Sequence, residues 1–284
     1  MTTRALIFSF GFASALLAGA SVFAASPAAK TATIPDFSQG NTAGWVSVGA
    51  DWLPPESGPG PVGFDPAHPH VGNNDPQGRQ PTPRIADVNS PILLPWAREA
   101  VKRANEEVLG GKTGFEAMST CWPAGVPGIM LFTAEPIFFV QTPKQILILY
   151  QRGPNQRHIL MNVPHSKNPK LSWYGESVGH YEGKTLVIDT IGLSDKTFVD
   201  NLRTPHSTKL HVIERYTISD DDRTMQGSAF VEDPGAYTMP WSATQRWRRV
   251  QQPILESVCA ENNNNYNYFH MRIDPIPEAA KADF

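Results

Sequence analysis

Residues 173–190 read Trp-Tyr-Gly-Glu-Ser-Val-Gly-His-Tyr-Glu-Gly-Lys-Thr-Leu-Val-Ile-Asp-Thr, and residues 204–216 read Thr-Pro-His-Ser-Thr-Lys-Leu-His-Val-Ile-Glu-Arg-Tyr. Both stretches are rich in β-branched and aromatic residues, which favour strands. A polar loop separates them. Loops held by rigid strands are where binding and catalytic groups concentrate, so this part of the chain indicates where a site lies.

The strand pattern extends outward from this stretch over most of the chain after Gly128. Most links between the strands are short and carry Gly, Pro, Asn or Asp, as turns do. Eight to ten consecutive strands tend to close, because closure removes exposed edges. We therefore expect a mainly β protein with an antiparallel up-and-down barrel, whose interior suits one small ligand. Strands are predicted over residues 129–133, 137–141, 145–151, 157–162, 177–181, 184–190, 209–219, 224–232, 242–250 and 254–259.

One helix is predicted, over residues 95–109. Pro95 suits the first helical position, and Gly110 with Gly111 ends the helix. Its apolar residues recur at helical spacing and form one stripe. We expect this helix to pack against the barrel. The members of the stripe are Ala97, Val101, Ala104 and Val108.

The N-terminal residues fit a secretion signal over residues 1–25. Arg4 supplies a short basic region, an apolar run follows, and Val22-Phe-Ala24 fits a cleavage site. The alternative is an uncleaved anchor helix, but the apolar run is short for a bilayer span. No later segment is long and apolar enough to cross a membrane. We expect a periplasmic or secreted protein that is not inserted in a membrane after cleavage.

The remaining regions are an irregular arm and a tail. Residues 26–90 are rich in Pro, Gly, Asn and Ser, so they bury little apolar surface by themselves. They are expected to wrap the domain as an irregular arm anchored by Trp45 and Trp52. Residues 91–265 then hold the helix and the barrel, and residues 266–284 form the tail.

The charge balance and the absence of known binding motifs exclude several classes of partner. The chain carries 24 Lys and Arg against 27 Asp and Glu, which makes nucleic acid a poor partner. No phosphate loop or dinucleotide fingerprint is present, and the His68-Pro-His70 pair lacks a third ligand, so neither cofactor nor metal is expected.

Cys121 and Cys259 permit one disulfide in an exported protein. The alternative is two separate buried thiols.

Several motifs taken together resemble a large family of exported bacterial proteins, over residues 91–265. The resemblance implies a signal peptide and a lipocalin-like β-barrel, and it implies no particular activity. The chain departs from the common form of the family at Lys184 and at Leu193-Ser194. The motifs are Cys121-Trp-Pro-Ala-Gly-Val-Pro127, Val140-Gln-Thr-Pro143, Ile148-Leu-Tyr150, Glu182-Gly-Lys-Thr-Leu-Val-Ile-Asp-Thr190, Pro205-His-Ser207, Glu214-Arg-Tyr216, Tyr237-Thr-Met-Pro-Trp241 and Glu256-Ser-Val-Cys-Ala-Glu-Asn-Asn263.

Glu214 is the most informative carboxylate. On a strand it shares an otherwise apolar face with Val212 and Tyr216. A carboxylate there either pairs with a buried arginine, for which Arg246 and Arg248 are candidates, or has a pKa raised by burial. A raised pKa would suit a general acid or base.

Asp189 and His206 are further candidates for proton transfer. Asp189 ends a strand, where it would either act chemically or cap the following turn. His206 lies in a loop beside strand ends, where it would either shuttle protons or make a structural hydrogen bond. Asp200 is a candidate to orient it. Ser177 lies in a Gly-x-Ser-x-Gly pattern, but a strand follows where a nucleophile elbow requires a helix.

The sequence leaves three functions open. The first is an exported enzyme that binds a small, largely apolar or aromatic molecule in the barrel and transforms it by cofactor-free acid–base chemistry, as an isomerase, lyase or hydrolase. Its candidate catalytic residues are Asp189, His206 and Glu214, and its candidate ligand-binding residues are Tyr174, Tyr237 and Trp241. The second is a carrier with the same cavity, and the third a structural envelope protein. A serine hydrolase that uses Ser177 is a further alternative.

Overall fold

The structure is a computed structural model of the chain. The signal sequence predicted over residues 1–25, the tail predicted over residues 266–284 and Cys259 lie outside the described residues. The disulfide between Cys121 and Cys259 therefore stays a prediction. The structure describes residues 34–39, 43–73, 75–114, 117, 121–132, 135–151 and 156–257.

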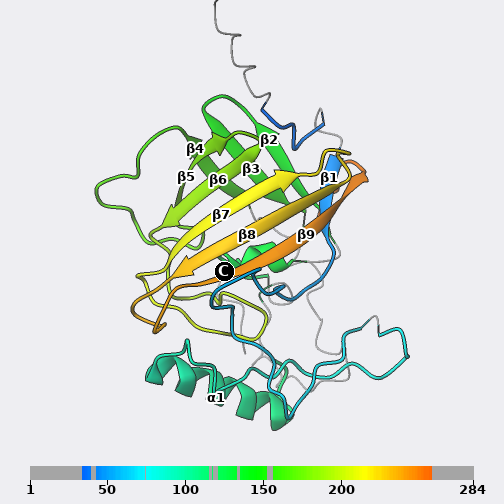
Figure 1. The fold of residues 1–284 in the computed structure, drawn as a ribbon, viewed down its shortest axis with the longest axis vertical. Helices are drawn as coiled ribbons and strands as arrows, with labels where there is room; N and C mark the ends of the chain where they lie inside the picture. The colour runs from blue at the N-terminus through cyan, green and yellow to red at the C-terminus, as the bar shows by residue number, and fades with distance from the viewer. Residues whose placement is uncertain are drawn as a thin grey trace, which may run out of the picture. The chain divides into compact units, whose positions relative to one another are not determined.

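The described strands form one closed barrel, which confirms the predicted fold class. Figure 1 shows β7, β8 and β9 side by side, with β1 next to β9, where the sheet closes. The strands are β1 (Ala43–Ser47), β2 (Ile137–Gln141), β3 (Gln145–Tyr150), β4 (Gln156–Met161), β5 (Glu176–Glu182), β6 (Thr185–Ile191), β7 (His211–Ile218), β8 (Thr224–Glu232) and β9 (Trp241–Gln251).

Neighbouring strands are antiparallel at every pair but one. β4 and β5 run parallel, with Ile159 opposite Ser177. A parallel pair needs a long crossover, and residues 162–175 provide it. The expectation of a purely up-and-down sheet is therefore wrong at this pair, because a connection of this length crosses over to form a parallel neighbour instead of a hairpin.

Three further elements differ from the sequence prediction. β1 lies inside the arm that was expected to be irregular, and all its residues are buried. The strand expected over residues 129–133 is instead a 3-10 helix, η1 (Gly128–Leu131), because a short buried apolar run looks the same in either form. Residues 254–257, expected to begin a last strand, have no regular structure.

The helix α1 (Pro95–Leu109) has the predicted bounds. Its buried Asn105 bonds both the N–H and the carbonyl of Ala86, and the Trp96 indole donates to the Gly235 carbonyl at 2.6 Å. The helix therefore packs against the end of the arm and the β8–β9 connection. None of the described helices has the length and apolar character needed to span a bilayer.

Large side chains fill the described interior of the barrel. Most strands, such as β4 and β7, alternate buried and less buried residues, as a closed sheet requires. At Gly227, an added Cβ would lie 2.7 Å from the Trp247 ring, so the glycine makes room for that ring. The largest side chains buried on the strands are Trp45, Phe139, Ile146, Ile148, Arg157, Tyr216, Trp241 and Trp247.

The long connections gather at one end of the barrel, which we call the connection end. The start of β5 pairs with the end of β6, and the start of β7 with the end of β8. This register brings together the connections 192–210 and 233–240 and the last part of 162–175, which begins beside the middle of β5 because β4 runs parallel to it. The opposite end, the hairpin end, holds short turns, including one at Gly183, whose φ of 60° suits a two-residue hairpin.

Candidate functional site

Glu214 lies inside the barrel, as predicted, and is wholly buried. Its partner is Arg157 of β4, whose Nη2 lies 2.5 Å from the carboxylate, and the Tyr216 hydroxyl donates to the other oxygen at 2.8 Å. Arg246 and Arg248, the partners considered from sequence, are exposed because the alternate residues of β9 point inward. The alternation of inward and outward residues along this strand could have excluded both arginines as partners of Glu214.

Arg157 is the centre of this interior network. Its guanidinium donates to the Ser177 hydroxyl at 3.1 Å and to the Thr190 hydroxyl at 2.6 Å. Burial alone would lower the pKa of Arg157, but the charge of Glu214 and the bond to it raise the pKa above its usual value. The network therefore compensates the Glu214 charge within the protein.

Ser177 belongs to this network rather than to a nucleophile elbow. It lies within β5, is 3% exposed, and its oxygen also contacts Thr190 at 2.9 Å. Its hydrogen-bond partners are thus a cation and a hydroxyl, and no imidazole among the described residues bonds it. A serine nucleophile needs a base within hydrogen-bond reach.

Asp189 lies on the outer face of β6 and not with Glu214. Adjacent residues of a strand point to opposite faces, and Ile188 is the register partner of Glu214. Oδ1 of Asp189 contacts the Nε2 atoms of His165 at 3.2 Å and His211 at 2.8 Å. Asp189 thus joins two histidines on the outer surface.

His206 is buried in the β6–β7 connection and serves its local structure. Its Nδ1 lies 2.9 Å from the Ser207 carbonyl, which can only accept, so Nδ1 carries the proton. Nε2 of the neutral ring then accepts from the Thr197 hydroxyl at 2.8 Å. Burial lowers the pKa of His206, which favours the same neutral form. The structure therefore does not unite His206, Asp189 and Glu214 in one site.

The three candidate aromatic residues lie toward the connection end. Tyr237 and Trp241 are buried with ring centroids 6.0 Å apart, and the Tyr237 hydroxyl donates to the Pro205 carbonyl at 2.9 Å. Tyr174 is half-buried against the core, and burial raises its pKa. Trp241 also packs against Trp52 of the arm, at 6.5 Å.

A cavity of about 220 Å³ lies between the arm and the β6–β7 connection; we call it the arm cavity. Two bonds hold its walls together: the Trp52 indole donates to the Val199 carbonyl at 3.1 Å, and the Asn201 amide donates to the Ala50 carbonyl at 2.6 Å. Its lining is mainly apolar and comprises Asp51, Trp52, Pro54, Gly60, Pro61, Val62, Gly63, Phe64, Leu131, Asp200, Asn201 and Leu202.

Asp200 is the buried acid in this lining. Only 8% of its surface is exposed. Its Oδ1 accepts from the N–H groups of Leu202 at 2.9 Å and Thr204 at 3.0 Å, whereas Oδ2 is buried with no hydrogen-bond partner among the described residues. Burial raises the pKa of Asp200, and the Thr204 side chain and the N–H groups of Thr204 and Leu202 oppose this by stabilising the charged form.

The other charged groups near the arm cavity have partners. Asp51, which also lines it, accepts from Nε of Arg84 at 3.1 Å. The buried Arg203 donates to the Arg84 carbonyl at 2.7 Å, and its charge lowers the pKa of Asp200 only as the smallest of several effects. Asp200 therefore combines burial, a free oxygen and a cavity, as ligand-binding carboxylates do.

Sequence reasoning considered Asp200 only as a residue that would orient His206. The structure shows no hydrogen bond between these two side chains in the described part of the chain; His206 bonds Thr197 and Ser207 instead. The signal that was present is an acid between apolar residues, Val199 and Leu202, in a loop otherwise expected to be polar. The cavity beside Asp200 exists because the arm packs over this loop. That packing is a long-range contact, which local sequence patterns do not predict.

Comparison with known proteins adds no assignment. No protein-family model matches the chain, and no curated protein or solved structure matches it. The resemblance to exported bacterial proteins therefore stays a prediction. Within the described residues, no group of three or more His, Cys, Asp or Glu side chains is placed to hold a metal ion.

Proposed function

We propose that the protein binds a small, largely apolar molecule in the arm cavity and holds a cationic amino group of that molecule with Asp200. The observation that carries the proposal is the buried Oδ2 of Asp200, which has no partner within the described residues although it belongs to a carboxyl in the lining of that cavity. A buried carboxylate without a partner is unfavourable, and a ligand that supplies a charged donor removes that penalty.

The lining favours an ammonium group over other donors. Trp52 and Phe64 bring aromatic rings to the lining, and ring faces attract cations; one face of Phe64 is already stacked on His70, with centroids 5.0 Å apart. Asp51 adds a second carboxylate, although Arg84 already pairs with it. The volume suits a molecule of about one ring, since an apolar cavity of about 150 Å³ can bind benzene.

Binding can be tested with phenethylamine and its neutral counterpart, 2-phenylethanol, followed by calorimetry or by the fluorescence of Trp52 and its neighbours. We expect the amine to bind at least about tenfold more tightly, a difference of about 1.4 kcal/mol. Asp200→Asn should remove this preference, because the amide keeps the acceptor for the backbone N–H groups and loses the charge.

Glu214→Gln is the matched control, since it changes a buried carboxylate that belongs to the interior network. It should leave the preference for the amine intact. Equal binding of both probes by the unaltered protein, or an unchanged preference after Asp200→Asn, would refute the ammonium site.

A second candidate function is acid–base catalysis in the same cavity, favoured by the raised pKa of Asp200. A carboxyl whose pKa is raised keeps its proton to a higher pH than an exposed one and can act as a general acid. In that case Asp200, rather than the predicted set of Asp189, His206 and Glu214, carries the proton. Incubating the bound amines with the protein and analysing them by mass spectrometry separates turnover from binding alone.

We also propose that the protein is exported, with cleavage near Ala24, and that Cys121 pairs with Cys259. The intact mass of secreted or periplasmic material tests the first proposal, and a mature chain that still begins at Met1 would refute it. Titration of thiols in the unfolded, unreduced protein tests the second, and two free thiols would exclude the bridge.

A further inference from the structure

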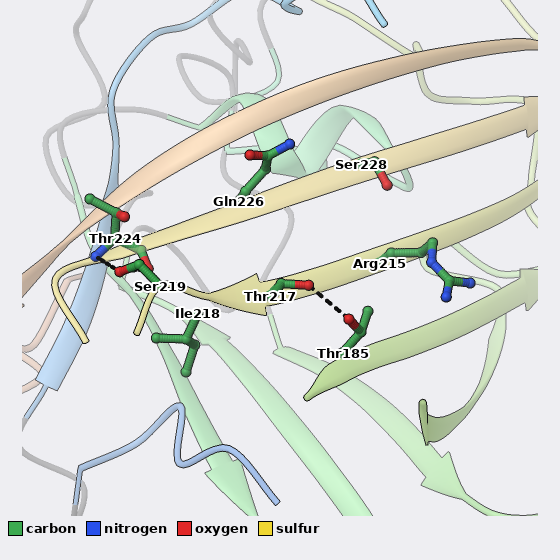
Figure 2. Close-up of a pocket in the computed structure, with 8 residues that line it drawn as sticks. All are labelled: Thr185, Arg215, Thr217, Ile218, Ser219, Thr224, Gln226 and Ser228. Carbon is green, nitrogen blue, oxygen red and sulfur yellow. Dashed lines mark hydrogen bonds between the residues drawn. The ribbon is translucent and has the colours of Figure 1, made fainter. Parts of the chain in front are cut away.

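A second concave surface lies on the outer face of the barrel, near the hairpin end, and we call it the outer depression. Its volume is about 430 Å³. Figure 2 shows the Gln226 and Ser228 side chains on β8 beside Thr217 and Arg215 on β7. All the lining residues but Ile218 have polar side chains, and the surface that they present is part polar and part apolar; they are Thr185, Arg215, Thr217, Ile218, Ser219, Thr224, Gln226 and Ser228.

Part of this lining is already engaged, and part is free. Thr185 and Thr217 share a hydrogen bond of 2.9 Å, and the Ser219 hydroxyl donates to Asp221 at 2.6 Å. The side chains of Gln226 and Ser228 make no hydrogen bond to other described residues. They offer an amide and a hydroxyl, each able to donate and accept, to a ligand in the depression.

Two arginines on the neighbouring strand give this face its charge. Arg246 is the register partner of Gln226, and Arg248 is the register partner of Thr224. Opposite residues of antiparallel strands point to the same face, so Arg246 and Arg248 lie exposed on the outer face of β9, next to the strand that carries Gln226 and Thr224 and just outside the lining itself. Neither has a carboxylate partner within the described part of the chain.

Most acids of the same region are engaged elsewhere. Glu182 pairs with Arg215, Asp220 with Lys184 at 2.8 Å, and Asp222 with Arg249 at 3.8 Å. Asp221, in the same turn, accepts only from the Ser219 hydroxyl and the Arg223 N–H and has no cationic partner among the described residues. Arg223, Arg246 and Arg248 outnumber it, so the unpaired local charge is net positive, although the whole chain is slightly acidic. A mixture of neutral hydrogen-bonding groups and free guanidinium groups matches a ligand that carries hydroxyls and anionic groups together.

We propose that the outer depression binds an acidic saccharide, with its carboxylates on Arg246 and Arg248 and its hydroxyls on Gln226 and Ser228. The planar guanidinium holds carboxylates through two parallel hydrogen bonds. The lining contains no aromatic ring, so it lacks the stacking surface that would favour a neutral sugar by apolar contact. This site is separate from the arm cavity and does not depend on the function proposed for it.

The test is titration of the full protein with a galacturonate trisaccharide and with a neutral glucose trisaccharide, followed by NMR or calorimetry. We expect the acidic sugar to bind at least about tenfold more tightly and its affinity to fall as salt rises, because exposed ion pairs are screened. The double variant Arg246→Gln/Arg248→Gln should weaken binding of the acidic sugar by about tenfold or more. Gln226→Ala should weaken it less.

Arg103→Gln is the matched control, because Arg103 is an exposed arginine on α1. It should leave binding unchanged, and all variants should keep the melting temperature since the altered side chains are exposed. The proposal is overturned if neither sugar binds, if both bind equally, or if the double variant and the α1 control lose affinity to the same extent.

Discussion

Glu214 and Asp200 are both buried carboxylates, yet they lie in opposite situations. Glu214 is enclosed by the barrel and meets Arg157 and Tyr216 within hydrogen-bond distance. Asp200 lies in a connection, uses one oxygen for the backbone and leaves the other without a partner in the described residues. Glu214 is the more conspicuous of the two in the sequence, because it lies on an otherwise apolar strand face. In the structure, however, Arg157 compensates its charge.

This difference teaches that burial of an acid does not by itself indicate a functional site. A buried charge paired within the protein contributes to the structure, and removal of one partner is strongly destabilising. A buried carboxyl with a free oxygen beside a cavity can instead bind a ligand. The two acids should therefore respond differently to substitution, Glu214 through stability and Asp200 through binding.

The largest effect is expected at Glu214. Glu214→Ala should lower the free energy of unfolding by roughly 3–5 kcal/mol, because Arg157 is left buried without its counter-charge. Glu214→Gln should lower it less, since an amide oxygen still accepts a hydrogen bond. Denaturant unfolding measures both, and a Glu214→Ala protein as stable as the unaltered one would break the comparison.

At Asp200 the structural contribution is smaller and comes from one oxygen. Asp200→Ala removes the acceptor of two backbone N–H groups, so it should lower the free energy of unfolding by about 1–3 kcal/mol. Asp200→Asn keeps an acceptor in place and should lower it clearly less. If Asp200→Ala and Asp200→Asn are equally destabilised, the hydrogen bonds to Oδ1 do not account for the loss of stability.

The pH dependence of stability sharpens the same contrast. Burial raises the pKa of Asp200 in the folded state above its unfolded value of about 3.9. The folded state then binds more protons between these two values, so this group lowers stability as pH rises through that window. The stability of Asp200→Asn relative to the unaltered protein should therefore increase from about pH 4 upward. A constant difference would contradict the raised pKa.

His206 should give the smallest effect and the opposite sign. Burial lowers its folded pKa below the usual value of about 6.5, so the unfolded chain takes up the proton first as pH falls. Stability should be complete above about pH 6.5 and decline below it, and His206→Gln should reduce this decline. Thermal melts over that range test it, with His158→Gln, an exposed histidine on β4, as the control.

Local patterns predicted much of the fold. The helix bounds, most strands and the inward face of β7 follow from apolar residues that recur every 3.6 residues in a helix and every second residue in a strand. These periods are properties of the local backbone geometry. The same reasoning failed at β1 and η1. The five buried residues of β1 lie within a Pro- and Gly-rich segment, and η1 is a four-residue apolar run that periodicity cannot assign.

The sequence by itself determined that the chain forms a mainly β barrel and that Glu214 points into it. Only the tertiary structure decided which groups meet. Arg157 meets Glu214 because both point into a closed barrel, although β5 and β6 separate their strands along the sheet. The arm meets Asp200 because Trp52 bonds Val199, 147 residues away. Alternation along a strand depends on the local backbone, whereas contacts between distant side chains depend on which segments become neighbours.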